Sequence, residues 1–168
     1  SGKTSLGQIL ADRLALPFTD LDELIQARAG RSIPRIFEEE GEAGFRQREI
    51  AALASLVDQA DGVVALGGGA LLDPHNRALA ESAGVVLCLS AQIEILQARL
   101  NTTANTRPLL APESGDAHDD PPVLNPSAAI SNQKLVSLLA ARSGHYASFS
   151  CQLDVSQLNV AEAAWQAQ

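Results

Sequence analysis

Ser1-Gly2-Lys3-Thr4 opens the sequence, and the amphipathic pattern over residues 4–15 predicts a helix directly behind it. Gly-Lys-Thr is the end of the motif G-x-x-x-x-G-K-[ST], in which backbone amides surround phosphates, the lysine reaches the outer phosphate oxygens and the hydroxyl ligates Mg²⁺. An ordinary helix N-cap is the alternative for these three residues taken alone. Because the chain starts inside the motif and without Met, we expect upstream residues to have been lost.

Beyond this helix, strand-like and helical patterns alternate to the end of the chain. The strands are predicted over 16–19, 63–66, 85–89 and 150–155, and the helices over 22–29, 33–40, 42–58, 74–83, 91–100, 132–143 and 160–167. Repeated strand-then-helix units predict an α/β fold with a parallel sheet and helices on both faces. Gly30 and Gly41 separate the early helices.

Composition limits the classes of function. A length of 168 residues, 46% of them hydrophobic, suits one domain, and a net charge of −8 makes nucleic acid an unlikely partner. The sequence has no apolar run long enough to span a membrane and no signal peptide, so we expect a cytoplasmic protein. Cys88 and Cys151 lie in strand-like runs and are predicted to be buried free thiols. The scattered histidines have no metal-ligand spacing, and the Glu38-Glu39-Glu40 run is interpreted as a solvated helix face.

Two further motifs follow predicted strands. Asp20 and Asp22, two residues apart on an extended segment, would point to one side at the carboxyl end of a strand, where ligands bind in open α/β sheets. One could hold the hydration shell of Mg²⁺ and the other a substrate hydroxyl, or the pair could simply cap a helix. Gly67-Gly68-Gly69 permits close approach of a ligand, with a tight turn as the alternative.

In combination these motifs make the sequence similar to the shikimate kinase family, over residues 2–110 and again from about 138 onward. The elements that carry the resemblance are Asp20-Leu21-Asp22, Gly30-Arg31-Ser32-Ile33, Ile36-Phe37, Gly41-Glu42-Ala43-Gly44-Phe45-Arg46-Gln47-Arg48-Glu49, Leu66-Gly67-Gly68-Gly69-Ala70 and Arg107-Pro108-Leu109-Leu110. The resemblance implies a P-loop NTPase-type three-layer αβα fold, one domain over 1–168, whose first strand, in the middle of the sheet, is missing from the sequence. It also implies a kinase of aromatic amino-acid biosynthesis that transfers a phosphoryl group from ATP to the 3-hydroxyl of shikimate, giving shikimate 3-phosphate and ADP.

For the nucleotide, the resemblance implies that Lys3 is catalytic and contacts phosphates, that Thr4 and Asp20 hold Mg²⁺, and that Arg107 is a catalytic lid residue that closes over the transferring phosphate. The other residues assigned to ATP are Gly2, Ser5, Arg99 and Gln157. The family often packs adenine between an arginine and a proline. Arg99 is near the first of these places and Val160 occupies the second, so we expect an altered nucleotide affinity or preference.

For the acceptor, the resemblance implies a substrate-binding segment over about 21–50. Asp22 would bind the hydroxyls of shikimate and act as the base, and Gly67, Gly68 and Gly69 would touch the substrate through their backbone. Arg46 and Arg142 would bind its carboxylate, which suits an acidic protein because the planar guanidinium matches a carboxylate. Glu49, three residues after Arg46 on one helix, could fix that guanidinium.

Residues 101–132 are expected to form a lid that contains an acidic, Pro-rich insertion, longer than is usual for the family. Three other readings remain open at this point: a non-catalytic ligand-sensing domain of a transcription regulator, a gluconate-type small-molecule kinase, and one module of a larger polypeptide. The partners we expect are shikimate and ATP, with no nucleic acid and no membrane, and the protein is expected to be a monomer.

Overall fold

The computed structural model describes residues 2–59, 61–96 and 127–167, with only the backbone for 127–134. Its helices are α1 (Lys3–Leu14), α2 (Leu21–Ala29), α3 (Ile33–Val57), the short 3₁₀ helix η1 (Ala70–Leu72), α4 (Pro74–Ala83), α6 (Ser127–Ala147) and α7 (Val160–Gln166). Its strands are β1 (Phe18–Asp20), β2 (Val63–Ala65), β3 (Leu87–Ser90) and β4 (Cys151–Asp154). The alternation of strands and helices predicted from the sequence is confirmed.

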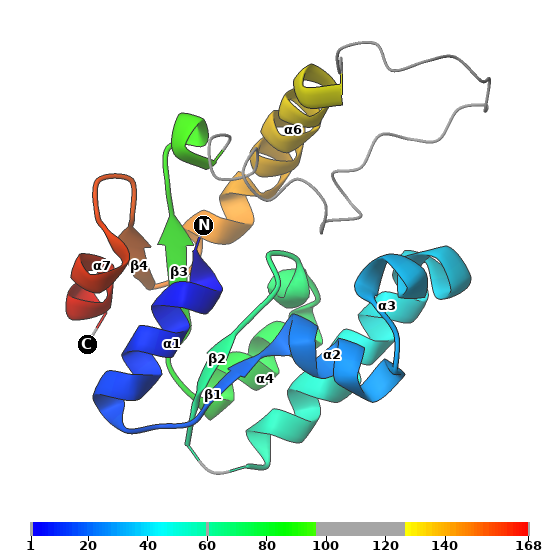
Figure 1. The fold of residues 1–168 in the computed structure, drawn as a ribbon, viewed down its shortest axis with the longest axis horizontal. Coiled ribbons are helices and arrows are strands. Elements are labelled where there is room, and N and C mark those ends of the chain that lie inside the picture. Colours follow the sequence, from blue (N-terminus) through cyan, green and yellow to red (C-terminus); the bar gives the residue numbers. More distant parts are fainter. Residues whose placement is uncertain (1, 60, 97–126, 168) are drawn as a thin grey trace.

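The strands form two parallel pairs. Phe18 to Asp20 of β1 align with Val63 to Ala65 of β2, and β3 aligns with β4 in the same direction. Within the described ranges no ladder joins β2 to β3, so the strands form two separate two-stranded sheets (Figure 1). Parallel strands covered by helices are the arrangement that the sequence predicted.

Helix α1 packs between the two pairs of strands. It contacts α7 on one side and β1 and β2 on the other (Figure 1). A Cβ atom at Gly7 would lie 2.6 Å from Cε2 of Phe18, so the glycine allows α1 to approach β1 closely. Leu6 of α1 is buried in a cluster that also contains Leu153, Val155, Ala163 and Ala164. This packing fixes the N-terminal end of α1.

A second core lies under α2, α3 and α4, and glycines set the directions of the first two helices. Gly30 ends α2 in the left-handed conformation (φ 65°), and Gly41 interrupts α3 with φ 68° and ψ −174°. The predicted breaks at both residues are therefore confirmed. The buried members of this core are Leu21, Ile25, Ile36, Phe45, Ala52, Leu53, Ala70, Leu71 and Phe149.

The start of α6 and the burial of one thiol differ from the sequence predictions. Helix α6 begins at Ser127, whereas the sequence predicted a loop through 131 and a helix from 132 to 143. The cluster of prolines ends at Pro126, and α6 itself contains no proline. The prediction that both thiols are buried is wrong for Cys151, which is exposed because only Leu153 of β4 points into the core, while Cys88 is half-buried.

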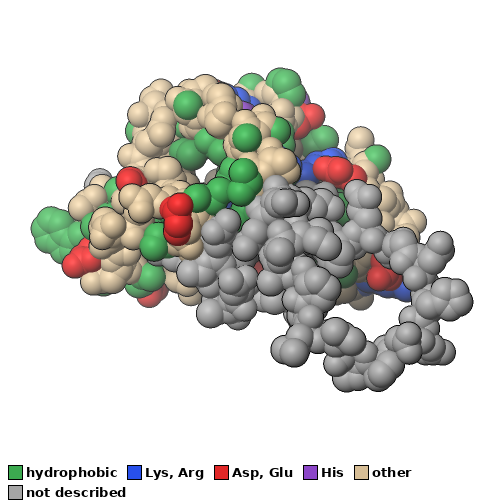
Figure 2. Space-filling view, turned by 90° about the horizontal axis from the view of Figure 1, so that it is seen from above, with side chains coloured by type: hydrophobic (Ala, Val, Ile, Leu, Met, Phe, Trp, Pro, Cys, Tyr) green, Lys and Arg blue, Asp and Glu red, His purple; other side chains and the backbone are tan. Residues whose placement is uncertain are grey.

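Basic side chains form no large patch on the face of the described residues that Figure 2 draws. On the face drawn in Figure 2, Lys and Arg side chains of the described residues occur in small groups beside acidic ones. Within the described ranges, no helix has the length and hydrophobicity that crossing a membrane requires.

Candidate active site

The N-terminal end of α1 has a backbone and a charge pattern that favour an anion. Gly2 precedes the helix in a left-handed conformation (φ 87°), and Lys3 is its first residue. Among the described residues no side chain caps this end, and the first turn contains no acidic residue. Unpaired backbone amides and the helix dipole together favour phosphate at such an end.

Thr4 and Asp20 are joined directly. The Thr4 hydroxyl donates to Oδ2 of Asp20 at 2.7 Å, although the two residues come from α1 and the end of β1. The other carboxylate oxygen of Asp20 accepts from the backbone amides of Asp22 and Glu23 and so caps α2. Because the Thr4 proton is committed to Asp20, the lone pairs of the hydroxyl oxygen stay available to a cation.

The cap changes the expected position of Asp22. The sequence predicted Asp20 and Asp22 on one side of an extended segment, but α2 begins at Leu21, so Asp22 lies in the first helical turn. The helix starts there because the Asp20 side chain supplies an N-cap acceptor. Asp22 still faces the glycine turn: a Cβ atom at Gly67 would lie 3.4 Å from its Oδ1 atom. The helix-cap alternative is thus correct for Asp20.

Arg46 is held by two acidic residues of its own helix. Its Nη1 atom donates to Oε2 of Glu49 at 2.6 Å, and its Nη2 atom donates to Oε1 of Glu42 at 3.2 Å. The predicted contact between Arg46 and Glu49 is confirmed. Glu49 is only 1% exposed, which makes this a charge pair with one fully buried partner.

Burial raises the pKa of Glu49 above its ordinary value; Arg46 opposes this shift, and the neighbouring charge of Asp22 adds to it. Burial lowers the pKa of Arg46, but the hydrogen bonds and charges of Glu49 and Glu42 outweigh burial and raise it overall. Burial therefore has opposite results for the two groups. Glu49 loses its hydration, whereas the Arg46 side chain stays 23% exposed and keeps contact with water. The arginine is therefore charged across the whole physiological range.

The turn at Gly67, Gly68 and Gly69 is the point where these side chains meet. A Cβ atom at Gly67 would lie 3.2 Å from Oε1 of Glu49, and one at Gly69 would lie 2.7 Å from Nη2 of Arg46. Any side chain at position 69 would displace the guanidinium. The glycines thus form more than a tight turn, since two of them make room for charged groups.

Helix α6 reaches the same turn from the other side. The Gly68 carbonyl accepts from the Tyr146 hydroxyl at 2.8 Å and from Nη1 of Arg142 at 3.4 Å. Asp22, Arg46 and Arg142, which the family resemblance assigned to one ligand, therefore border one turn. Tyr146 was missed because the predicted helix ended at 143; its spacing of four residues from Arg142 would have indicated a shared face.

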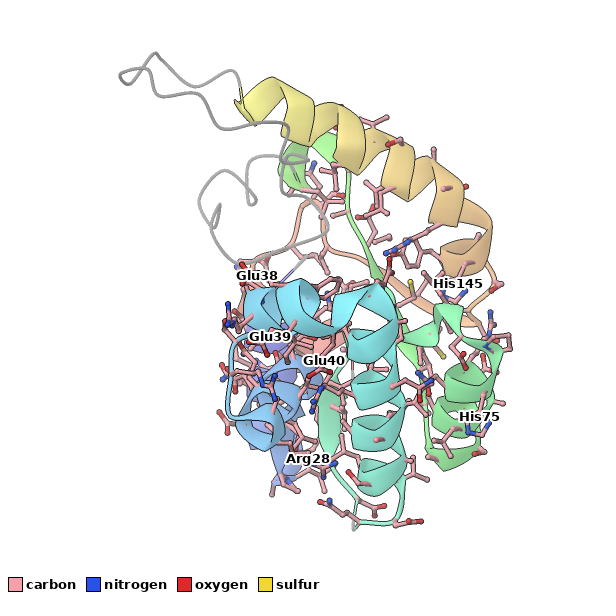
Figure 3. The ribbon with its side chains drawn as sticks, turned by 90° about the vertical axis from the view of Figure 1, so that its right-hand side faces the viewer. Arg28, Glu38, Glu39, Glu40, His75 and His145 are labelled. Atoms are coloured by element: carbon pink, nitrogen blue, oxygen red, sulfur yellow. The ribbon has the colours of Figure 1, made fainter. Side chains whose placement is uncertain are left out.

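Other predicted residues stand apart or are not described. Ser5 and Gln157 are exposed, on α1 and on the segment after β4, and Val160 is the first residue of α7. Arg99, Arg107, His118 and most of the predicted lid lie outside the described residues. Figure 3 shows His75 on α4 and His145 near the end of α6. No cluster of three or more His, Cys, Asp or Glu suited to a metal occurs in the described part of the chain.

The run Glu38-Glu39-Glu40 lies on the first half of α3 (Figure 3) and takes part in ion pairs. Glu40 accepts two hydrogen bonds from Arg48, at 2.8 and 2.7 Å, across the break at Gly41. The interpretation as a solvated face fits Glu38 and Glu39, which are exposed, while Glu40 is partly covered by its pair with Arg48. Its pair with Arg48 connects the two halves of α3 next to Arg46.

Comparison with known proteins decides the family. The model of the family described as shikimate kinase matches residues 1–151. The chain belongs to the shikimate kinase family. A shikimate kinase of Geobacter sulfurreducens is 39% identical over 160 residues, which cover 95% of this chain and 79% of that protein.

Other members of the shikimate kinase family match a shorter part. Those of Salinibacter ruber and Nitrosomonas europaea are 51% identical over 115 residues and 48% identical over 118 residues, which cover 68% and 70% of this chain. The matches take in 56% and 54% of those proteins, so the chain spans about half the length of these relatives.

Solved structures of the family share the fold. Shikimate kinase from Acinetobacter baumannii in complex with shikimate superimposes with a TM-score of 0.84 at 32% identity, over 99% of this chain and 84% of that one. The enzyme from Aquifex aeolicus gives a TM-score of 0.73 at 25% identity, over 99% and 86% of the two chains. The P-loop NTPase-type αβα fold is therefore established.

Proposed function

We propose that this protein transfers the γ-phosphoryl group of ATP to the 3-hydroxyl of shikimate, giving shikimate 3-phosphate and ADP in aromatic amino-acid biosynthesis. The observation that carries the proposal is the approach of Asp22, Arg46 and Arg142 to one glycine turn. Membership of the shikimate kinase family and the likeness to a relative solved with shikimate support it.

The acceptor site is proposed at the turn of Gly67, Gly68 and Gly69, with 21–50 as the substrate-binding segment. Shikimate is a small ring acid that carries one carboxylate and several hydroxyls. Arg46 and Arg142 bind the carboxylate, since two guanidinium groups supply planar pairs of donors in a chain of net charge −8. Asp22 accepts from the hydroxyls, and the glycine backbone contacts the ring side.

The phosphates of ATP are proposed to bind at the N-terminal end of α1. Gly2, Lys3 and the amides of the first turn surround them, and the Lys3 ammonium neutralises the outer oxygens. Ser5, Arg99 and Gln157 complete the nucleotide contacts. Arg107, from the lid, covers the transferring group.

Mg²⁺ fits the oxygen ligands at the start of this site. The Thr4 hydroxyl and the Asp20 carboxylate are joined by a hydrogen bond of 2.7 Å. Mg²⁺ prefers such oxygen ligands when nucleotide phosphates and water complete its coordination shell. Thr4 would hold the ion directly and Asp20 through water. When bound, the ion supplies charge neutralisation at the phosphates.

The chemical step needs little beyond position and charge. The 3-hydroxyl oxygen forms a bond to the γ-phosphorus while the bond from that phosphorus to the bridging oxygen of ADP breaks. Asp22 orients the hydroxyl and accepts its proton. Lys3 and Arg107 stabilise the charge on the transferring group.

The remaining expectations stay part of this proposal. We propose that residues 1–168 act as one domain, that the protein works as a monomer in the cytoplasm, and that its partners are small molecules and not nucleic acid. A reducing compartment suits two free thiols, one of them exposed.

ADP release by the full gene product tests the proposal, with shikimate and gluconate compared as acceptors. We expect ADP with shikimate only, and its loss in Asp22→Asn. Release with gluconate alone would indicate a different acceptor. Binding of shikimate without any turnover would contradict the kinase and favour a sensing domain.

A further inference from the structure

The Tyr146 hydroxyl holds the backbone of the glycine turn. It donates to the Gly68 carbonyl at 2.8 Å, the shorter of the two bonds which that oxygen receives, the other coming from Arg142 at 3.4 Å. Tyr146 follows Arg142 by four residues, so both side chains leave one face of α6. The same carbonyl is thus the shared acceptor of the tyrosine and of the proposed carboxylate-binding arginine.

The hydrogen bond from Tyr146 fixes the peptide group between Gly68 and Gly69, whose carbonyl is not bonded by backbone amides of the turn. The carbonyls of Gly67 and Gly69 accept backbone amides, from Ala70 at 3.1 Å and from Leu72 at 3.2 Å. Among the described residues, by contrast, the Gly68 carbonyl accepts hydrogen bonds from side chains of α6. Because a peptide is planar and trans, holding this carbonyl toward α6 turns the Gly69 amide to the opposite side. Gly69 is also the residue against which the Arg46 guanidinium lies.

The end of α6 stays anchored without this hydroxyl. Arg77 of α4 donates to the Ser148 hydroxyl at 2.6 Å and to its carbonyl at 3.2 Å, and its guanidinium lies 4.4 Å from the centre of the Phe149 ring. The His145 ring contacts both Phe149 and Tyr146 edge-on. Replacing Tyr146 by Phe therefore removes one hydrogen bond and leaves the ring and the helix in position.

We propose that Tyr146 is a positioning residue for the acceptor site. Through the Gly68 carbonyl it sets the orientation of the Gly68–Gly69 peptide and places Arg142 beside it. The inference rests on the proposed function, since it assigns Tyr146 to affinity for the anionic acceptor. It does not assign Tyr146 to contact with the substrate or with the nucleotide.

Tyr146→Phe tests the inference in the full gene product. We expect the KM for shikimate to rise about fivefold, as the loss of one neutral hydrogen bond allows, with the KM for ATP, the kcat and the Tm close to wild type. Ser143→Ala is the matched control, because it removes a hydroxyl of the same helix that bonds to the Ala140 carbonyl at 2.9 Å, away from the turn. It should leave both KM values unchanged.

The possible outcomes separate the inference from the proposed function. If the KM and the dissociation constant for shikimate are unchanged in Tyr146→Phe, the inference is overturned. Turnover by the wild-type protein in the same experiment would still support the kinase. A parallel change in both KM values and the Tm would indicate a structural role and would also overturn it. If the wild-type protein binds shikimate without turnover, calorimetry of the two proteins decides: weaker binding by Tyr146→Phe supports the inference although the kinase is rejected.

Discussion

Arg46 and Glu49 form a charge pair in which only one partner is buried: Nη1 lies 2.6 Å from Oε2, and Glu49 is 1% exposed whereas the Arg46 side chain is 23% exposed. The pair lies beside Gly67 and Gly69, so it sets where the guanidinium points. A buried carboxylate that holds an accessible arginine is an arrangement suited to binding an anion.

Replacing Glu49 by Gln should weaken the acceptor site. The amide keeps the shape but loses the charge that holds Arg46, and a hydrogen bond to a charged group contributes about 2 kcal/mol, so we expect the KM for shikimate to rise by at least about tenfold. Glu42→Gln is the control, because that carboxylate is 57% exposed and its bond to Arg46 is longer, at 3.2 Å. Equal effects of the two changes would contradict a special role of the buried pair.

The same substitution should alter how stability depends on pH. The pKa of Glu49 is raised in the folded state, chiefly by burial, so its contribution to stability is present below the unfolded value of 4.5 and is lost as pH rises through the raised value. Glu49→Gln removes this loss. The Tm of the variant relative to wild type should therefore rise as the pH increases above the unfolded value of 4.5. Parallel Tm curves would show that burial of this carboxyl does not shift its pKa.

Asp20→Asn should separate the two roles of Asp20. Asparagine is as good an N-cap as aspartate, so α2 and the Tm should be little affected. The lost charge beside Thr4 should raise the Mg²⁺ concentration needed for half-maximal activity by about tenfold. Asp73→Asn is the control, since Asp73 caps α4 in the same way, accepting from the amides of His75 and Asn76. An unchanged Mg²⁺ requirement in Asp20→Asn would contradict a role at the metal.

Alanine substitutions in the glycine turn should have graded effects. A Cβ atom at position 69 would lie 2.7 Å from Nη2 of Arg46, which must move, and such displacement can reduce kcat/KM for shikimate by about a hundredfold. At position 68 the nearest atom is the Tyr146 hydroxyl oxygen at 3.6 Å, an ordinary contact, so the reduction should be much smaller. Gly84→Ala, with φ 176° and open space, should change neither kcat/KM nor Tm. The reverse order of effects at 68 and 69 would contradict the packing described.

Gly41→Ala should lower stability through backbone conformation alone. Among the described residues no atom outside the helix backbone lies within 4 Å of a Cβ at this position. However, φ is 68° and ψ is −174°, a conformation in which a residue with a side chain costs about 1–3 kcal/mol. Denaturant unfolding measures the loss, and Gly84→Ala again serves as the control. A loss at Gly41 no larger than at Gly84 would show that the break in α3 relaxes without cost.

Local patterns in the sequence predicted much of the fold. The breaks at Gly30 and Gly41 follow from residues that tolerate positive φ, and α4 extends over Pro74–Ala83 as predicted. The start of α6 could not be predicted in the same way. Its first residues directly follow a proline-rich segment. A sequence window that includes these prolines predicts a loop, although the residues from 127 onward favour a helix.

For the candidate site, the sequence indicated most of the side chains that meet at the glycine turn, but only one of their contacts, that between Arg46 and Glu49. The sequence indicated Thr4 and Asp20 separately, while their hydrogen bond depends on how α1 packs against β1. Tyr146 was missed because the predicted helix ended at 143, and its bond to Gly68 depends on tertiary packing. The bond between Glu40 and Arg48 depends on the bend of α3 at Gly41. Arg99 and Arg107 remain predictions from the family resemblance alone.

Phosphorus NMR of the full gene product with ATP, Mg²⁺ and an equal amount of shikimate tests the central claim most directly. The account predicts that the γ-phosphate signal of ATP is replaced, one for one, by a phosphomonoester signal that belongs to the 3-position of shikimate. Inorganic phosphate as the only new signal, or an unchanged spectrum from a folded protein, would contradict the account.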